Sequence, residues 1–472
     1  MNESKIQQET KHEGYGRRQK WSFGMGSFAQ FFINTSFNTW VLSFYFAAVG
    51  LNIGFIMLAF VLWTIWNAVN DPLIGYLSDR THTRWGRRKP YLMIGLIPVL
   101  IIELILWLPP VGNQILGFVY LLIMLISYDT FYTMLALPTD SLFPELYTSV
   151  EERAEVNTIR QILSTIGLIL AFLVPGLFIE LTEMEGYLTN GIVTSVIVGI
   201  TMLIFIKWGA VERVEFKQDH KQAFSFFEGL KYSLKNKGFI LYTLMFFLYE
   251  YVLLVLATTV PLYSLHVLGQ SSTFLTAIML GLLFIVGIIT VIVWRKLDVK
   301  LGSKKAYGIS IISYIVTSIP LLFISADAQG PEMAFILALI IVSLMGFGFG
   351  GMLYFVYLII ADVIDEDELK TGVRHEGAFF GITNFFMRLA MVFSILTVGL
   401  VFTSSGWENY DIIVVADVLL GLKLLVFLFP TIALVINLIC LYFYPFSKSR
   451  VDEIKVKLDE LHKEKKERVK TT

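Results

Sequence analysis

The side chains most able to do chemistry in this chain are ionisable and amide groups set inside long apolar runs. Asp71 is the leading one, because it stands before Pro72 in the middle of such a run, close to Asn67 and Asn70. These three polar positions share one face of a helix. One carboxylate and two amide oxygens are hard ligands that suit a small cation. The alternative is a buried Asp71 that only hydrogen-bonds its neighbours.

Arg388 is the only basic residue near the middle of its apolar run. A buried guanidinium must meet an anion. We expect Arg388 to pair with Asp71 or Asp140 in the protein without solute, or to bind an anionic group of a substrate. The alternative is an ion pair with a structural role only. Three further acids lie inside apolar runs and are candidates by the same reasoning, namely Glu103, Asp129 and Glu250.

The composition requires elements that can hold such groups in a membrane. Of 472 residues 56% are hydrophobic and 16% are charged, whereas soluble chains have about 25% charged residues. Twelve spans of about 20 residues need roughly 240 apolar residues, and the chain has more. This composition excludes a soluble enzyme and a disordered chain. The net charge of −1 excludes a nucleic-acid binder, which needs a basic surface. One cysteine excludes a disulfide framework.

The basic residues alternate from one side to the other along the chain. Apart from Arg388 and Lys423, every Lys and Arg falls in alternate breaks between the apolar runs. The charged residues in the other breaks are all acidic. This bias predicts twelve spans with both termini in the cytoplasm. We expect a multi-pass protein of the plasma membrane. The charged tail predicts either a short amphipathic helix at the membrane surface or a solvated segment.

The long charged break in the middle of the chain divides it into two halves of six spans. The loops 75–90 and 295–305 repeat a pattern, an Asp followed by Gly and a basic pair. Such duplication implies a pseudo-two-fold axis along the membrane normal, with the substrate site between the halves. The predicted parts are an N-terminal arm (1–20), a six-helix bundle (21–208), a cytoplasmic loop (209–236), a second bundle (237–445) and a tail (446–472).

These motifs resemble a known family. The duplicated loop is similar to the cytoplasmic signature of the major facilitator superfamily. The segments 66–75, 84–90 and 361–376 resemble the glycoside–pentoside–hexuronide:cation symporters within it. The resemblance covers nearly the whole chain. It implies an all-α membrane protein with twelve transmembrane helices in two pseudo-symmetric halves.

The resemblance implies a coupling-cation site at Asp71, Asn70 and Thr133, with Asn67 beside them. The family has a second Asp where this chain has Asn67. A lone carboxylate in a cavity of low dielectric constant is disfavoured as an anion, which suits it to carry a proton. We therefore expect H⁺ coupling first, Na⁺ coupling next and uncoupled transport last, with no other cofactor and no bound metal.

The solute site departs further from the family. Its two sugar-gripping aspartates align with Phe31 and Ala136, so both are absent here. A rearranged polar set remains on spans one, four and eleven. We expect the solute to contact Gln30, Asn34, Asn38, Tyr132, Asp140, Thr383, Asn384 and Arg388. The alternative for Asp140 is a structural role, in which it binds groups at the cytoplasmic end of a helix.

Charged residues at the cytoplasmic ends of the spans form the expected gate. By resemblance they hold the halves together in the outward-facing state, and the alternative is that they only set the topology. The expected gate residues are Asp79, Arg80, Arg84, Arg87, Arg88, Asp298, Asp362 and Asp365.

We therefore expect a secondary transporter, not an enzyme, that moves a small polar solute by alternating access with cation symport. A sugar or glycoside is the first substrate class, and a lysophospholipid or other amphipathic solute is the alternative. The six histidines are scattered, and no nucleophile or metalloprotease motif occurs. A sensor without flux stays open. The expected partners are the solute and membrane lipid, without nucleic acid, and the protein is expected to be a monomer.

Overall fold

The computed structural model describes residues 15–81, 83–147, 150–211, 236–371 and 376–471. Within helices some side chains also lie outside the described part, among them those of Asp79, Arg80 and Asn384. The described chain is helical, with a single isolated bridge between Thr83 and Gly86. The expected all-α class is confirmed.

The first group of helices comprises α2 (Arg17–Ser43), α3 (Ile53–Arg80), α4 (Lys89–Ile105), α5 (Gln114–Leu146), α6 (Val150–Gly176) and α7 (Met184–Ile204). The second comprises α9 (Lys237–His266), α10 (Thr273–Leu301), α11 (Ser303–Ser318), α13 (Pro331–Thr371), α14 (Glu376–Ser404), α15 (Ala416–Val426) and α16 (Leu428–Phe443). Short π or 3₁₀ turns extend some of them, at Phe44–Ala48, Phe205–Gly209 and Ile319–Leu322, and α12 (Ala326–Gln329) is a single turn. A tail helix, α17 (Lys448–Thr471), follows.

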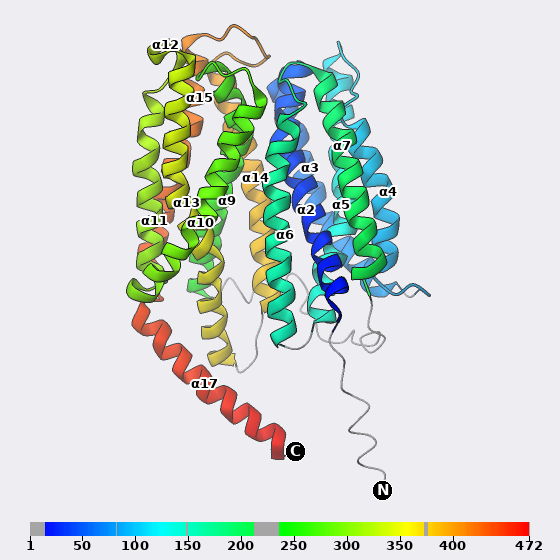
Figure 1. Ribbon diagram of the computed structural model, residues 1–472, viewed down its shortest axis with the longest axis vertical. Helices are drawn as coiled ribbons and strands as arrows, with labels where there is room; N and C mark the ends of the chain where they lie inside the picture. Colours follow the sequence, from blue (N-terminus) through cyan, green and yellow to red (C-terminus); the bar gives the residue numbers. More distant parts are fainter. Residues whose placement is uncertain (1–14, 82, 148–149, 212–235, 372–375, 472) are drawn as a thin grey trace.

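Ten of these segments are long and apolar enough to cross a membrane, with α15 and α16 counted as one. Helices α2 and α4 run alongside them in the bundle (Figure 1) and complete the expected twelve. Local sequence explains the helix starts. The side chains of Asn52, Asn113 and Asn236 accept hydrogen bonds from backbone amides in the first turns of α3, α5 and α9.

The two groups stand side by side (Figure 1). Here we call α2–α7 the N-half and α9–α16 the C-half. Three helix pairs join them along a seam, α2 with α9, α3 with α14, and α6 with α10. Helix α17 lies beneath the C-half (Figure 1), and we call that end of the bundle the α17 end and the opposite one the far end.

Glycines on α13 allow close packing inside the C-half. A Cβ atom at Gly350 would collide with the Gly287 carbonyl of α10, and one at Gly351 would collide with Ser310 of α11. Small residues at such contacts let helix backbones approach in a membrane. Helix α13 therefore packs closely against α10 and α11 because these positions carry glycine.

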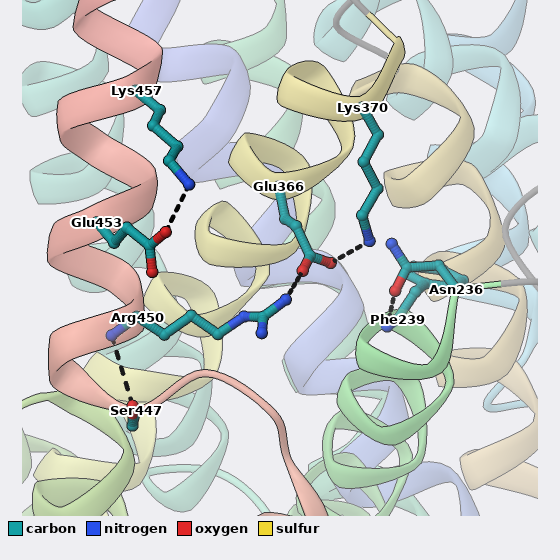
Figure 2. Close-up of polar contacts among 8 residues, drawn as sticks. All are labelled: Asn236, Phe239, Glu366, Lys370, Ser447, Arg450, Glu453 and Lys457. Atoms are coloured by element: carbon teal, nitrogen blue, oxygen red, sulfur yellow. Dashed lines mark hydrogen bonds and ion pairs between the residues drawn. The ribbon is translucent and has the colours of Figure 1, made fainter.

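The tail forms a helix that docks on the protein. Ile454 and Leu458 are buried, and Arg450 pairs with Glu366 at the end of α13 (Figure 2). Lys370 reaches the other oxygen of the same carboxylate at 2.8 Å. The apolar side of the helix is thus covered by the C-half, in agreement with the helical reading of the tail.

Candidate functional site

The polar residues of α3 meet α5 in a buried network at mid-length. Asn67 donates a hydrogen bond to Oδ1 of Asp129. Asn70 donates to Oδ2 of Asp129 at 2.9 Å and lies 3.1 Å from the Thr133 hydroxyl. Asn67, Asn70, Asp129 and Thr133 are all less than one tenth exposed. Both oxygens of the Asp129 carboxylate are therefore held by amide donors.

Asp71 connects this network to the C-half. The Thr133 hydroxyl donates to Oδ1 of Asp71 at 3.0 Å, and the guanidinium of Arg388 on α14 forms an ion pair with Oδ2. This pair crosses the seam between α3 and α14. The Asp71 carboxylate therefore has a basic partner, because tertiary packing brings Arg388 to it. Of the anions considered for Arg388, the structure selects Asp71.

Two oxygen atoms in the network have no hydrogen-bond donor. Oδ1 of Asn67 and Oδ1 of Asn70 are buried and unpartnered among the described residues. A buried amide oxygen without a partner costs free energy unless another group binds it. Together with Asp71, Asp129 and the Thr133 hydroxyl, they form a set of oxygen ligands. Such a set can coordinate a small hard cation.

A second polar group lies on α2, α5 and α6. Arg160 of α6 pairs with Asp140 at 3.0 Å and contacts the Ser27 hydroxyl at 3.0 Å. Its guanidinium lies over the Phe143 ring, 4.5 Å from the centroid. Three fifths of the Asp140 side chain is exposed, against about one fifth for Arg160. This acidic group can accept hydrogen bonds from a hydroxylated solute.

The other predicted solute contacts are partly occupied by the protein itself. Gln30 donates to the Ala136 carbonyl at 3.2 Å, and Asn38 donates to Asn34 at 3.1 Å. Tyr132 stacks on Tyr128, with ring centroids 5.7 Å apart. An aromatic surface beside amide groups is typical of sites that hold small polar ligands.

Helix α14, the eleventh predicted span, contributes fewer solute-binding groups than expected. The Thr383 hydroxyl is buried and donates to the carbonyl of Phe379 in its own helix. Its donor is therefore used within α14. The side chain of Asn384 lies outside the described residues. Arg388 is the member of this set that reaches across the seam.

Sequence reasoning gave one residue of the site no specific role and missed another. Asp129 is one of the further acidic candidates, and the structure makes it the acceptor on which Asn67 and Asn70 converge. Arg160 was counted with a charged break, yet it lies inside α6. The helical stretch 150–176 runs apolar from Ile159 onward with Arg160 at its start, which is the signal that could have identified it.

The predicted gate residues with described contacts bond within their own half. Asp298 accepts from Ser303 at 2.8 Å and lies 3.5 Å from the Tyr354 hydroxyl. The Arg84 guanidinium lies over the ring of its neighbour Trp85 at 4.5 Å. Arg88 and Asp362 are buried. Arg87 and Asp365 also make interactions, and the side chains of Asp79 and Arg80 lie outside the described residues.

At the far end an aromatic cluster closes the seam. It consists of Phe46 of the N-half with His266, Phe402, Trp407 and Tyr410 of the C-half, whose neighbouring ring centroids lie 4.8–5.7 Å apart. Burial, together with Asp411, raises the pKa of Tyr410 to about 12, so its hydroxyl stays protonated and bonds Nε2 of His266 at 3.2 Å. The amide of Ile53 also donates to the Glu408 carbonyl at 2.9 Å. The site is shut off from this end.

A family model described as MFS/sugar transport protein matches residues 22–448. The chain belongs to this family. As a member it is a multi-pass membrane transporter and not an enzyme, as the sequence predicted. Solved structures agree on the fold. A D-xylose-proton symporter superposes with a TM-score of 0.66 at 14% identity, covering 91% of this chain and 98% of that one. The nucleoside transporter NupG gives 0.64 at 15% identity, covering 91% and 100%.

Curated relatives of this family member share about a quarter of its residues. An uncharacterized symporter of Bacillus subtilis is 25% identical, with 92% of each chain covered. The isoprimeverose transporter of Lactiplantibacillus pentosus is 24% identical, covering 82% of this chain and 80% of the relative. A sodium-dependent lysophosphatidylcholine symporter of Danio rerio is 21% identical, covering 82% and 77%.

Proposed function

We propose that this protein imports a small neutral sugar or glycoside by symport with a cation that binds at the network around Asp71. The observation that carries the proposal is the Asp71–Arg388 ion pair across the seam, set in a network with two unpartnered amide oxygens. A cation that binds Asp71 competes with the guanidinium. Cation binding therefore changes the link between the halves.

That competition provides a coupling mechanism. An equilibrium between two conformations shifts only when a ligand binds them with different affinity. With the cation in place, Arg388 is released from Asp71 and the α3–α14 contact loosens. Solute bound at the neighbouring polar groups then lets the halves close around it. The loaded transporter thereby switches from the outward-facing to the inward-facing state.

The oxygen ligands favour Na⁺ as the coupling ion. Two carboxylates, two amide oxygens and a hydroxyl match the ligand preference of hard cations. The sequence argument for H⁺ depends on a single carboxylate at the site, and the network contains a second one, that of Asp129. A Na⁺-dependent relative exists in the lysophosphatidylcholine symporters. Coupling to H⁺ is the competing outcome of the test.

The substrate class follows from the family and from the site. The family model is described by sugar transport, and one relative is named for isoprimeverose. Around Asp140 and Arg160 the site offers charged and amide groups rather than an apolar lining. A lysophospholipid is the second candidate, favoured by the lysophosphatidylcholine relatives and by Phe31, which is 47% exposed in place of a sugar-gripping acid.

The basic loops support an orientation as well. The Lys and Arg residues gather in the breaks at the α17 end, and the positive-inside bias places that end in the cytoplasm. We assign the protein to the plasma membrane as a monomer, with both termini cytoplasmic. The aromatic cluster then closes the external side.

Uptake into proteoliposomes tests the function. Isoprimeverose, xylose and lysophosphatidylcholine are offered with an inward Na⁺ gradient, an inward H⁺ gradient or neither. We expect Na⁺-driven accumulation of a neutral sugar. Accumulation of the lysolipid alone would replace the sugar proposal with the second candidate, and accumulation that follows only the H⁺ gradient would overturn the choice of ion.

A further inference from the structure

Helix α9 presents one accessible stripe along its length. Between Tyr242 and Val260 the residues that are not buried are Leu244, Phe247, Glu250, Leu253, Leu254 and Ala257. They recur every three or four positions, so they lie on one side of the helix. Glu250 is the only polar member of this stripe, and it stands at mid-length of α9, between the buried residues Tyr249 and Tyr251.

The stripe lies on the side of the seam between the halves. Asn437 of α16 donates to the Met245 carbonyl at 2.9 Å, and Glu250 is roughly 140° around the helix from Met245. On the neighbouring flank Phe247 contacts Phe393 of α14, with ring centroids 5.5 Å apart. Helix α9 also packs against α2 of the N-half. Glu250 therefore points away from α16 and lies next to the flank of α9 that faces α14, a helix of the seam.

Unlike Asp71, Asp129 and Asp140, Glu250 has no hydrogen-bond or ion-pair partner among the described residues. Asp71, Asp129 and Asp140 each receive hydrogen bonds or an ion pair from the protein. Among the described residues none bonds to Glu250, and no charged group acts on it. The charged residues on the helices packed against α9 are Arg388 of α14, which is engaged by Asp71, Asp417 and Lys423 of α15, and groups in the terminal thirds of α2, α10, α13 and α14.

A carboxylate that is removed from bulk water and left unpaired is costly, and such a residue in a membrane protein marks a functional site. A transported solute must also contact both halves, because only then does its binding favour closure. The N-half supplies Asp140, Arg160 and Gln30. The C-half, in contrast, offers Arg388, which is already paired, and Glu250.

We propose that Glu250 is the solute-binding group of the C-half, and that its carboxylate accepts hydrogen bonds from adjacent hydroxyls of a neutral sugar. This inference rests on the proposed function and narrows its substrate class. Two hydroxyl donors can satisfy the two carboxylate oxygens at once. An anionic sugar such as a hexuronide is repelled by the same group, so the site discriminates against it.

Two measurements test the proposal: equilibrium exchange of the solute across proteoliposome membranes, and thermal stabilisation of the purified protein by the solute. The solutes are isoprimeverose, xylose and a glucuronide. The variants are Glu250→Gln and Glu250→Ala. Glu103→Gln is the matched control, because Glu103 is equally an acid inside a helix but is fully buried within the N-half. We expect Glu250→Gln to weaken binding of the neutral sugar by about 10- to 100-fold, with the Na⁺ affinity and the control unchanged.

Each other result overturns the inference in a recognisable way. Unchanged sugar affinity in both Glu250 variants would remove Glu250 from the solute site while leaving the proposed function standing. Normal exchange with lost accumulation in Glu250→Gln would make Glu250 a coupling residue instead. If the wild-type protein binds neither neutral sugar, both the proposed function and this inference fail. A Glu250 variant that does not fold is replaced by Glu250→Asp, for which we expect an increased KM without loss of the folded state.

Discussion

The two halves of the bundle handle charge differently at mid-depth. In the N-half, Asn67, Asn70, Asp129 and Thr133 form a continuous hydrogen-bonded network between α3 and α5. In the C-half, Leu256, Leu283 and Met345 are among the apolar side chains that line one pocket. The C-half contributes Arg388 and Glu250 at the seam.

This difference indicates a division of labour. A network of fixed donors and acceptors binds an ion with defined geometry, because its groups are already oriented. The C-half meets this network through the Asp71–Arg388 pair at the seam. We infer that the N-half senses the cation and that the C-half responds through Arg388.

The largest effect is expected from breaking the Asp71–Arg388 ion pair between the halves. Arg388→Gln should abolish Na⁺-driven accumulation, because the C-half loses its response to the charge on Asp71. Folding should persist, since Gln still hydrogen-bonds. Uptake and thermal stability of the same preparation are the measurements. Normal uptake by this variant would remove Arg388 from the coupling mechanism.

Asp71→Asn supplies the companion variant, and the double variant Asp71→Asn/Arg388→Gln tests whether the two act as a pair. Losing one partner leaves an uncompensated charge, which costs about 3–5 kcal/mol in a buried site. We expect the double variant to be more stable than Asp71→Asn alone, with transport still absent. Additive losses of stability would show that the two side chains are independent.

A smaller effect is expected inside the network itself. Asn70→Ala removes one donor to Asp129 and one unpartnered oxygen, and should weaken Na⁺ affinity by about 10- to 100-fold. Sugar affinity measured at saturating Na⁺ should change little. Asn113→Ala, which removes a helix cap away from the site, is the control. Equal Na⁺ affinities in wild type and Asn70→Ala would mean that the cation binds elsewhere.

The far-end cluster should have a moderate effect on conformation. Trp407 is 3% exposed and packs against Phe46 of the other half. Trp407→Ala should weaken the closure and increase external labelling of a cysteine placed at position 38 severalfold, in a variant lacking Cys440. Trp21→Ala, at a residue that is 48% exposed, should not. A labelling rate that is unaffected by Trp407→Ala would show that other contacts hold this end closed.

The smallest effect is expected at the tail. Arg450→Ala breaks a half-exposed ion pair to Glu366, which keeps Lys370 as a second partner. Pairs near the surface contribute about 0–1 kcal/mol, so the melting temperature should fall by a few degrees at most and uptake should persist. Loss of uptake at full stability would instead assign α17 a role in the transport cycle.

The helices were predictable because the signals that form them are local. Apolar runs, Asn caps and Gly breaks specify each helix within its own segment, and a membrane leaves backbone groups no partner other than their own helix. The face of α3 that carries Asn67, Asn70 and Asp71 was predictable for the same reason. The tail helix was one of two open readings, and only its docking on α13 decided between them.

The partners of the charged residues were not predictable. Asp71 and Asp140 were both candidate anions for Arg388, and Arg160 was not considered as a partner of Asp140. The structure pairs Arg388 with Asp71 and Asp140 with Arg160, because packing of α14 on α3 and of α6 near α5 sets which side chains meet. The unpartnered state of Glu250 is likewise a property of the assembled helices.

The sequence alone therefore determined the helices, the membrane class and the face on which the polar residues of α3 lie. These depend on hydrophobic content and on periodicity, which are properties of neighbouring positions. Only the tertiary structure decided that Asp71 is paired, that Asp129 is the centre of the network and that Glu250 has no partner among the described residues. The interaction between charges depends on distances of a few ångströms across helices, and residues far apart in the chain reach such distances only through packing.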